Sequence, residues 1–541
     1  MSYKAPDEKD FEAMIGIVGK NYASNNKAIT ASYLAKSVMG LESQIPDIVV
    51  RPKYTEEIRK ILIYCSAEKI AVSPVSGGLS GGFACPTIKP AGVLLDLGRM
   101  DRIIEIDEAN RYAIVEPGVT NGGLWAYMEK YHPDWAPPIA DGAPPAATVM
   151  GDAIDRGFSL YTSSVGPQGD NFMCAEVVFP NGDVVRTGSW ALPFAKPFYK
   201  FGIGPDMWSF LMGSQGALGV VTKAAVKIYP HPKHKTVVAW GMSNPYDMQN
   251  LTLEVGHQEF GISHNTVMVQ GGNYPLVMTR WPKDKIPHEY EFFKEIGIPE
   301  WWMNWECWAQ TQEELDYVIK RINSMAEDFK KNRAKDGAAM KPWELHPKQI
   351  ASRMKKPNKI AIPYSFWDAG FLFITWYTPW NECAEFAEMY NREMEERDTK
   401  RRESPSLARN SSSHVDCVNR EMQTSYLHAY HLFRYFSRKK LLERKSTKDK
   451  DFEKVQELNA VTTEYSLKRG WLNYRPDPFI HIQAYYQAGM YWKYLRAFKK
   501  LVDPNFIMHP GHCGESLPDN WKAGSTIREI GILAIPKKAF V

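Results

Sequence analysis

The sequence predicts an α+β protein made of at least two folded units, and three observations support this. Short runs rich in valine and isoleucine alternate with helical patterns from residue 45 to about residue 230. Longer helical patterns, separated by strand-like segments, then continue to residue 468. The chain has 541 residues, and units of roughly 150 residues each would number two or three.

The first region begins with a polar, helical stretch that reaches residues 31–39. The strand-like run PDIVVRPK, the amphipathic helix TEEIRKILIYCSAE and the strand-like run KIAVS follow in that order. Further valine-rich runs and the helical pattern GGLWAYMEKYH lead to Pro230–Pro232. We therefore place the end of this unit at residue 232.

Residues 233–468 form the second predicted unit. Its helical patterns are EELDYVIKRINSMAEDFKK and ECAEFAEMYNREMEERD, and its strand-like segments are NWECWA and GFLFITWYTP. The tryptophan-rich stretch WWMNWECW predicts packing in a core and in loops, with a substrate channel as the less favoured alternative. Residues 469–541 predict a segment that returns to the first unit rather than a third core.

The charge pattern argues against nucleic acid or an anionic membrane as the main partner. The formal net charge is only +4, from 66 basic and 62 acidic residues. Residues Arg434–Lys454 are rich in lysine and arginine, but acidic residues interleave with them and no aromatic series accompanies them. This stretch predicts a solvated helix face rather than a nucleic-acid patch.

The sequence also predicts a cytoplasmic protein. No apolar run approaches the roughly 18 residues of a membrane span, and the start MSYKAPDEKDFEAM lacks the apolar segment of a signal peptide. The seven cysteines include no CxxC pair, which in so large a chain predicts reduced thiols and no disulfide framework.

A glycine-rich segment, PVSGGLSGGFACP at residues 74–86, directly follows a predicted strand. Its glycines allow tight turns that point several N–H groups inward, as a pyrophosphate requires. Residues 78–82 match the GxSxG motif of serine hydrolases, but that motif joins a strand to a helix, and here a proline and another strand follow. Neither the Rossmann nor the Walker phosphate motif is present. Taken alone, the segment is also explained by a glycine-rich turn that binds nothing.

Three further segments follow in order: VEPGVTNGGLW at residues 115–125, PPAATVMGDAIDRG at 144–157 and GSQGALGVVTKAAVKIYP at 213–230. Together with the glycine-rich segment, they resemble the flavin domain of the FAD-linked oxidases typified by vanillyl-alcohol oxidase and p-cresol methylhydroxylase. Each motif is weak by itself, and their order and spacing make the set specific.

The resemblance implies a two-domain flavoprotein. Residues 1–232, completed by the C-terminal segment 469–541, would form an FAD-binding domain of the p-cresol methylhydroxylase type. Residues 233–468 would form an α+β cap domain with an antiparallel sheet that contains the substrate site.

The resemblance also implies which residues contact FAD. Three groups would hold the pyrophosphate, the flavin and ribityl chain, and the adenosine, respectively: Ser76, Gly77, Gly78, Leu79, Ser80 and Gly81; Thr148, Val149, Gly151 and Asp152; and Gly216, Gly219, Val220 and Val221. Glycines permit the close backbone approach that such contacts need. Any single later glycine is equally explained by a strand turn.

The pair Tyr474-Arg475 points to the substrate. Family members that act on 4-alkylphenols carry a Tyr-Arg pair ahead of a C-terminal Pro-Gly motif, which here is Pro510-Gly511. A phenolate needs a fixed cation and a hydroxyl donor, and the pair supplies both. Arg475 would also neutralise charge at the flavin. The alternative is a core tyrosine beside an ordinary ion pair.

The other expected catalytic positions depart from the family pattern. Asp141 lies nearest to the catalytic carboxylate of the family, which aligns near Ala143. His512 stands where relatives have lysine or arginine, and Phe83 stands closest to a second phenolate tyrosine. His414, with Asp416 two residues later, falls near an active-site acid or threonine of relatives.

Two further histidines, His428 and His431, fall near a family histidine pair. Their spacing of three residues also suggests a metal, but no acidic residue or cysteine joins them at ligand spacing. We expect packing histidines and no metal.

Relatives often tether the flavin covalently through a histidine or tyrosine. The matching stretch, Phe371–Ile374, contains no nucleophile, so we expect non-covalent FAD. Tyr377 is the nearby tether candidate.

The resemblance thus implies an FAD-dependent oxidoreductase of aromatic compound metabolism that oxidises or hydroxylates a para-substituted phenol, with a 4-alkyl or 4-hydroxybenzyl group. Hydride would pass from the benzylic carbon to flavin N5 and leave a quinone methide, while Tyr474 and Arg475 hold the phenolate. Asp141, His414 or Asp416 would steer water onto the methide.

Two other functions stay open. One is an FAD-dependent D-2-hydroxy-acid dehydrogenase of the lactate or glycolate type, in which Arg475 binds a carboxylate. The other is a non-catalytic flavin-fold subunit of a larger complex. For the favoured function, the expected partners are a small phenolic substrate, an electron-acceptor protein such as a cytochrome, and further copies of the chain in a homo-oligomer.

Overall fold

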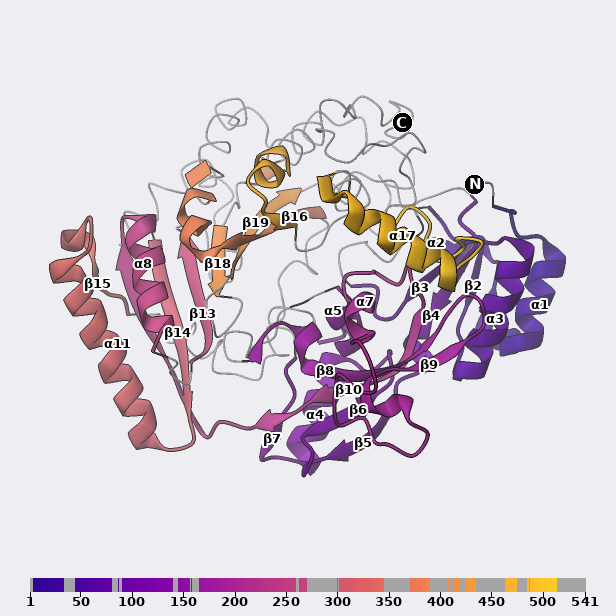
Figure 1. Cartoon of the computed structure of the whole chain (residues 1–541), viewed down its shortest axis with the longest axis horizontal. Coiled ribbons are helices and arrows are strands. Elements are labelled where there is room, and N and C mark those ends of the chain that lie inside the picture. Colours follow the sequence, from indigo (N-terminus) through magenta and orange to yellow (C-terminus); the bar gives the residue numbers. More distant parts are fainter. Residues whose placement is uncertain are drawn as a thin grey trace.

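The computed structural model describes most of the chain with intervening gaps, and α-helices and β-sheets both occur in it (Figure 1). The described residues are 3–33, 44–79, 86, 90–139, 145–155, 157, 165–258, 262–269, 299, 301–344, 370–386, 388–389, 407–408, 413–417, 424–433, 463–473, 484–485 and 487–512. They contain sheets of four, five, two and nine strands. The predicted α+β class is therefore confirmed.

The first sheet has the strand order β1–β2–β4–β3, and β4 runs parallel to both β2 and β3. The strands are β1 (Ala23–Ser24), β2 (Ile48–Val50), β3 (Val72–Val75) and β4 (Val93–Asp96). Helix α3 (Thr55–Glu68) matches the predicted amphipathic helix and connects β2 to β3, while α1 (Glu8–Val18) packs beside it. A shorter helix, α2 (Lys27–Ser32), follows α1.

The second sheet is antiparallel, with the order β5–β6–β10–β8–β9. Its strands are β5 (Ile103–Asp107), β6 (Tyr112–Val115), β8 (Phe172–Val178), β9 (Val184–Arg186) and β10 (Val220–Lys227). The helices α4 (Asn121–Tyr131), α5 (Val149–Ile154) and α7 (Trp208–Leu211) contribute to its core. A small ribbon pairs β7 (Trp135–Ala136) with β11 (Tyr229–Pro230).

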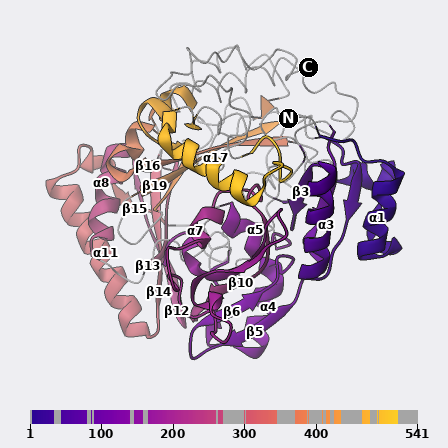
Figure 2. The same ribbon diagram turned by 45° about the vertical axis from the view of Figure 1, so that its right-hand side comes forward.

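The C-terminal part of the described chain packs on these two sheets. Helix α17 (Met490–Val502) buries Leu495 and Val502 in the core of the second sheet, and Figure 2 shows it crossing this part of the molecule near α5 and α7. The chain then pairs with β3, where Val72 bonds through its backbone to Ile507 and His509. Residues far apart in sequence thus meet at the strand that leads into the glycine-rich segment.

The third sheet contains nine strands and begins at residue 234. Its order is β15–β12–β14–β13–β18–β19–β16–β20, with β17 paired to β19. The strands are β12 (His234–Met242), β13 (Ile262–Val269), β14 (Trp301–Ala309), β15 (Lys341–Pro342), β16 (Gly370–Pro379), β17 (Leu407–Ala408), β18 (Ser413–Cys417), β19 (Thr424–Phe433) and β20 (Leu472–Asn473). All of the recorded pairings are antiparallel.

Two long helices cover one face of the third sheet. They are α8 (Pro245–Gly256) and α11 (Gln312–Asn332), and Figure 1 shows both on the outer side of β14. Trp301 and Trp305 of β14 lie in the core that these helices form with the sheet, as predicted for the tryptophan-rich stretch. The predicted basic helix at Arg434–Lys454 lies outside the described residues.

Four cysteines with described side chains, Cys65, Cys174, Cys307 and Cys383, are buried free thiols. Burial raises the pKa of the Cys307 thiol to about 12, so this thiol stays protonated and unreactive at neutral pH. Within the described part of the chain, no helix combines the length and the apolar character needed to cross a membrane.

Candidate cofactor and substrate site

The glycine-rich segment begins where strand β3 ends, and its backbone lies against the chain before α5. A Cβ on Gly77 would sit 3.2 Å from the carbonyl oxygen of Ala146 and 3.3 Å from the backbone nitrogen of Thr148. Gly78 has φ +64°, which favours glycine, and among its described neighbours only Val75 approaches the position of a Cβ, at 3.4 Å. Ser80 and Gly81 lie outside the described residues.

The predicted flavin segment meets this turn through hydroxyl groups. Thr148 is the N-cap of α5 and accepts a hydrogen bond from the backbone of Gly151 at 3.2 Å. The Thr148 and Ser76 hydroxyls lie 2.7 Å apart. A Cβ on Gly151 would sit 2.8 Å from both hydroxyl oxygens. Tertiary contacts therefore bring Ser76–Leu79 and Thr148–Asp152 together, although about 70 residues separate them.

The start of helix α4 supports the same arrangement. Asn121 donates from its side chain to the buried carboxylate of Asp152 at 2.7 Å. The backbone of Asn121 also donates to Ala147 at 2.8 Å, and that of Val149 to Val119 at 3.1 Å. The VEPGVTNGGLW and TVMGDA segments are thus held side by side by both side chains and backbone.

These residues fit the FAD that the resemblance implies. The turn at Gly77 and Gly78 has no side chain to hold a ligand away from its backbone, and the hydroxyls of Ser76 and Thr148 lie beside it. Backbone and hydroxyl donors without a carboxylate among them suit a pyrophosphate. The buried Asp152 faces Asn121 instead.

The third predicted cofactor segment approaches the same strand from another side. Gly216 has φ +78°, and a Cβ there would lie 2.5 Å from Cγ of Pro74, so its close packing requires glycine. A Cβ on Gly219 would lie 2.9 Å from the carbonyl oxygen of Val178. The side chains of Val220 and Val221 are buried in hydrophobic cores. Contact between these two valines and a cofactor would have to involve their backbone.

The predicted catalytic residue His512 lies against this third segment. Its Nδ1 is 2.9 Å from the side-chain oxygen of Gln215, and Nδ1 of His509 is 2.7 Å from the backbone oxygen of Gln215. The two imidazoles stack with centroids 3.8 Å apart, and both are fully buried. Sequence reasoning missed Gln215 and His509, although Gln215 lies inside the segment GSQGALGVVTKAAVKIYP and His509 directly precedes Pro510-Gly511.

A buried lysine, also missed, joins the same elements. Lys499 of α17 donates to the backbone oxygens of Ala217 at 2.6 Å and Met508 at 2.9 Å. Its ammonium lies 3.3 Å from the Asp503 carboxylate, and both side chains are fully buried. The sequence KKLVDPNF, which begins at Lys499, has the pattern of an ordinary helix end. Only the tertiary contacts show that Lys499 connects α17 to the Gly216 turn.

Thr148→Ala tests the coupling between the α5 cap and the cofactor turn. Loss of the capping hydroxyl is expected to lower the free energy of unfolding by about 1 kcal/mol and to raise the Kd for FAD, because the contact with Ser76 is lost as well. Denaturant unfolding of apoprotein and FAD titration measure the two effects. Thr311→Ala, which removes the cap of α11, is the control that should destabilise similarly without weakening FAD. Equal FAD affinity in both variants would contradict the arrangement.

Several predicted catalytic residues lie outside the described residues or have only a described backbone. Tyr474, Arg475 and Asp141 belong to the first group. The backbone of β20 pairs with β16 at Trp376 and Tyr377 and leads directly to Tyr474. His414 lies in β18, and its register partner is His428 in β19. The two histidine segments that the sequence singled out are thus neighbouring strands of one sheet.

The third sheet contacts the first unit through Trp308. This side chain shares a hydrophobic cluster with Trp125 of α4, Ala136 and Ile139. Lys235, opposite Trp308 in the strand register, lies over its ring at 5.3 Å, and burial lowers the pKa of this ammonium despite the opposing effect of Glu306. Ile139 stands two residues before the predicted Asp141, so this contact borders the expected catalytic segment.

The tether candidate Tyr377 lies in the third sheet. Its side chain is half-buried in β16, and its register partner is Tyr426 of β19.

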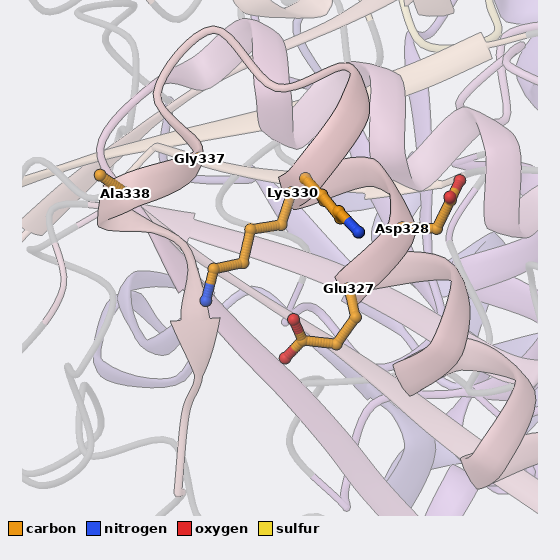
Figure 3. A pocket seen from close by; sticks show the side chains of 6 residues that line it. Glu327, Asp328, Lys330, Gly337 and Ala338 are labelled. Carbon is orange, nitrogen blue, oxygen red and sulfur yellow. The ribbon is translucent and has the colours of Figure 1, made fainter.

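A shallow pocket at the end of α11 is lined by charged side chains such as Glu327 and Lys330, which Figure 3 shows together with Gly337 and Ala338. Helix α11 covers the outer face of the sheet, so this pocket is no part of the cofactor site. No cluster of metal-ligating side chains occurs among the described residues.

Comparison with known proteins gives matches that each cover part of the chain. Residues 46–188 match the FAD binding domain family, which confirms the predicted FAD-binding domain. The glycolate oxidase subunit GlcD of Bacillus subtilis is 34% identical over 197 residues, which are 35% of this chain and 38% of that protein. The flavoprotein subunit of the hydroxylating 4-cresol dehydrogenase of Pseudomonas putida is 33% identical over 195 residues, 35% of this chain and 36% of that protein. The chain thus aligns with less than half the length of these curated relatives.

Comparison of folds extends over both units. The structure of 4-ethylphenol oxidase from Gulosibacter chungangensis, in complex with isoeugenol, superposes with a TM-score of 0.75 at 18% identity. The superposition covers 94% of this chain and 99% of that one. The predicted fold, an FAD-binding domain combined with a cap that carries an antiparallel sheet, is therefore confirmed.

Proposed function

We propose that this chain, a flavoprotein of the FAD-linked oxidase superfamily, is an oxidoreductase that oxidises or hydroxylates a para-substituted phenol at its benzylic carbon. One observation carries the proposal: the fold shared with 4-ethylphenol oxidase includes the cap as well as the FAD-binding part. Sequence identity does not decide between a phenol and a hydroxy acid as the substrate. The cresol dehydrogenase subunit and the glycolate oxidase subunit each align over only 35% of the chain.

Residues 1–232 and 469–541 would hold FAD, and residues 233–468 would cover it as the cap. The packing of α17 and the pairing of His509 with Val72 support this division. When bound, FAD supplies the hydride acceptor. The first two cofactor segments, Ser76–Leu79 and Thr148–Asp152, already lie together as such a role requires.

Residues of this chain would bind the phenol as its phenolate and orient the water that adds to the product. Tyr474 and Arg475 would hold the phenolate, which lowers the barrier to hydride loss because the product is a neutral quinone methide. Asp141, His414 or Asp416 would then orient water toward the methide carbon. His512, which is buried against Gln215, would add to the stabilisation of the phenolate.

A D-2-hydroxy-acid dehydrogenase is the second candidate, favoured by the 34% identity to the glycolate oxidase subunit. Arg475 would then bind a carboxylate. A flavin-fold subunit without its own activity is the third. A separate electron-acceptor protein and a homo-oligomer remain part of the proposal, and the relative that is itself named a flavoprotein subunit supports the former.

Anaerobic mixing with candidate substrates separates the three functions. We expect 4-ethylphenol to bleach the flavin absorbance, and D-lactate and glycolate to leave it oxidised. Bleaching by a hydroxy acid alone would select the second candidate. A flavin that stays oxidised with every compound but is reduced by dithionite would select the third.

Non-covalent FAD is the next expected result. Acid precipitation should release all of the yellow colour into the supernatant, because the stretch Phe371–Ile374 offers no nucleophile. Flavin retained on the washed pellet would contradict this, and Tyr377→Phe would then show whether Tyr377 is the tether. Heat precipitation is the control for acid-induced trapping.

A further inference from the structure

Strand β14 has two faces of different character. Trp301, Met303, Trp305 and Cys307 alternate along it and lie in the core beneath α8 and α11. Asn304 and Glu306 lie between them in the sequence and point to the opposite face of the sheet, because successive side chains in a strand alternate. Both are buried, with exposed fractions of 1% for Asn304 and 2% for Glu306.

This second face is directed at the FAD-binding part. Trp308 belongs to the same alternation as Asn304 and Glu306, and its side chain packs against Trp125 and Ile139 of that part. Figure 1 agrees, since α8 and α11 cover the outer side of the sheet and leave its other side toward the rest of the molecule. Asn304 therefore lies on the face where the cap meets the cofactor domain.

The Asn304 amide has no hydrogen-bond partner within the described part of the chain. Neither its nitrogen nor its oxygen is paired, although the side chain is buried. Buried polar groups are satisfied in the large majority of cases, so an unpaired amide of this kind needs an explanation. A ligand that binds at this face would supply the missing partners.

The strand register extends a polar row from Asn304 across the sheet. Thr266, Asp416, Tyr426 and Tyr377 follow one another as direct partners on successive strands. Direct partners in antiparallel strands share a face. The row ends at Leu472 of β20, two residues before the proposed phenolate-binding pair at Tyr474.

The row suggests how long the substrate is. Five strand spacings of about 4.8 Å separate β14 from β20, or about 24 Å across a flat sheet. Side chains at both ends and the sheet twist shorten the span that a substrate must bridge. A phenol held beside β20 would still need a para side chain of several bonds beyond the benzylic carbon to reach Asn304.

Charge around Asn304 indicates what that side chain carries. Glu306 lies two residues along the strand and Asp416 two strands away in the same row, while His264 is the register partner of Glu306. Lys235 is the register partner of Trp308, which follows Glu306 by two residues on the same face, and its ammonium lies over the Trp308 ring. A carboxylate at Asn304 would lie near the buried carboxylate of Glu306, whereas a neutral group can both donate to and accept from the amide.

We infer that Asn304 binds an uncharged hydrogen-bonding group, such as a hydroxyl or an amide, at the far end of the para side chain of the phenol. This inference rests on the proposed function and narrows it from simple alkylphenols to phenols with a longer, polar side chain. Asn304 is a specificity residue here, since it lies away from the benzylic carbon.

Two phenols of equal size test the inference, 4-(3-hydroxypropyl)phenol and 4-butylphenol. Their benzylic carbons are alike, and they differ in one terminal hydroxyl or methyl group. Wild type should have the higher kcat/KM with the hydroxyl compound. Asn304→Leu should lower kcat/KM for that compound tenfold to hundredfold, through KM rather than kcat, because a buried hydrogen bond is lost. With 4-butylphenol, the change should stay within about threefold.

Asn323→Leu is the matched control. Asn323 accepts a hydrogen bond from Trp240 at 3.0 Å on the outer side of the same sheet, so its loss affects stability without touching the inner face. It should leave the ratio between the two phenols at the wild-type value. Flavin content and melting temperature, measured for each variant, identify any misfolded protein, and Asn304→Ser then serves as a milder replacement for Asn304→Leu.

Two adverse outcomes are distinguishable. If Asn304→Leu and Asn304→Ser change kcat/KM equally for both phenols, Asn304 is structural and the inference fails while the proposed function stands. If neither phenol reduces the wild-type flavin, the proposed function fails and the inference falls with it.

Discussion

Gly78→Val is expected to yield folded protein that binds FAD at least a hundredfold more weakly. Gly78 has φ +64° and few described neighbours, so valine meets little protein but places a branched side chain where the backbone would approach the cofactor. The valine also strains the backbone, at about 1–2 kcal/mol. Fluorescence titration of apoprotein with FAD gives the Kd, and circular dichroism verifies the fold.

Gly470→Val separates this cofactor effect from backbone strain. Gly470 has φ +76°, and a Cβ there would meet nothing within 4 Å, so the strain is similar. The position is next to Trp471, which is buried in the core of the third sheet and not beside the cofactor turn. The control should lose comparable stability and retain FAD affinity. If Gly78→Val retains its full FAD complement, the segment at residues 76–79 is a structural turn and the cofactor map is wrong there.

Arg475→Ala is expected to abolish binding of a phenolate at neutral pH. A phenol has a pKa near 10 in water, so binding it ionised at pH 7 requires about 3 pKa units, or about 4 kcal/mol, of preferential stabilisation. One guanidinium hydrogen bond supplies about 1.5–3 kcal/mol of this, and the Tyr474 hydroxyl would add to it. The near-ultraviolet difference spectrum of bound 4-ethylphenol should show phenolate in wild type and neutral phenol, or no binding, in the variant.

Two further variants define the role of the guanidinium. Arg475→Lys keeps the charge but loses the planar fork, so it should bind better than Arg475→Ala and still reduce the flavin more slowly than wild type. Arg469→Ala removes a nearby arginine that pairs with Glu385, and it should leave the spectrum unchanged. A phenolate spectrum of full intensity in Arg475→Ala would remove this residue from the substrate site.

Local sequence patterns predicted much of the fold because they report local physics. The apolar spacing of TEEIRKILIYCSAE predicts α3, which the structure places at Thr55–Glu68. The strand-like segment GFLFITWYTP matches β16 at Gly370–Pro379. The glycine pattern of residues 74–86 likewise predicted a turn with inward backbone groups, and the structure describes its first part, Ser76–Leu79, in close contact with Thr148.

Contacts between distant segments were decided only by the tertiary structure. Nothing in KKLVDPNFIMHPGH or GSQGALG predicts that Lys499 bonds to Ala217, or that His512 and His509 share Gln215, because these pairs are almost 300 residues apart. Strand order has the same origin, since many pairings satisfy the same alternating pattern and only packing selects one. The sequence by itself determined the elements and the cofactor class of this protein. The register of the cap sheet, which places Asn304 on the face toward the cofactor domain, came from packing alone.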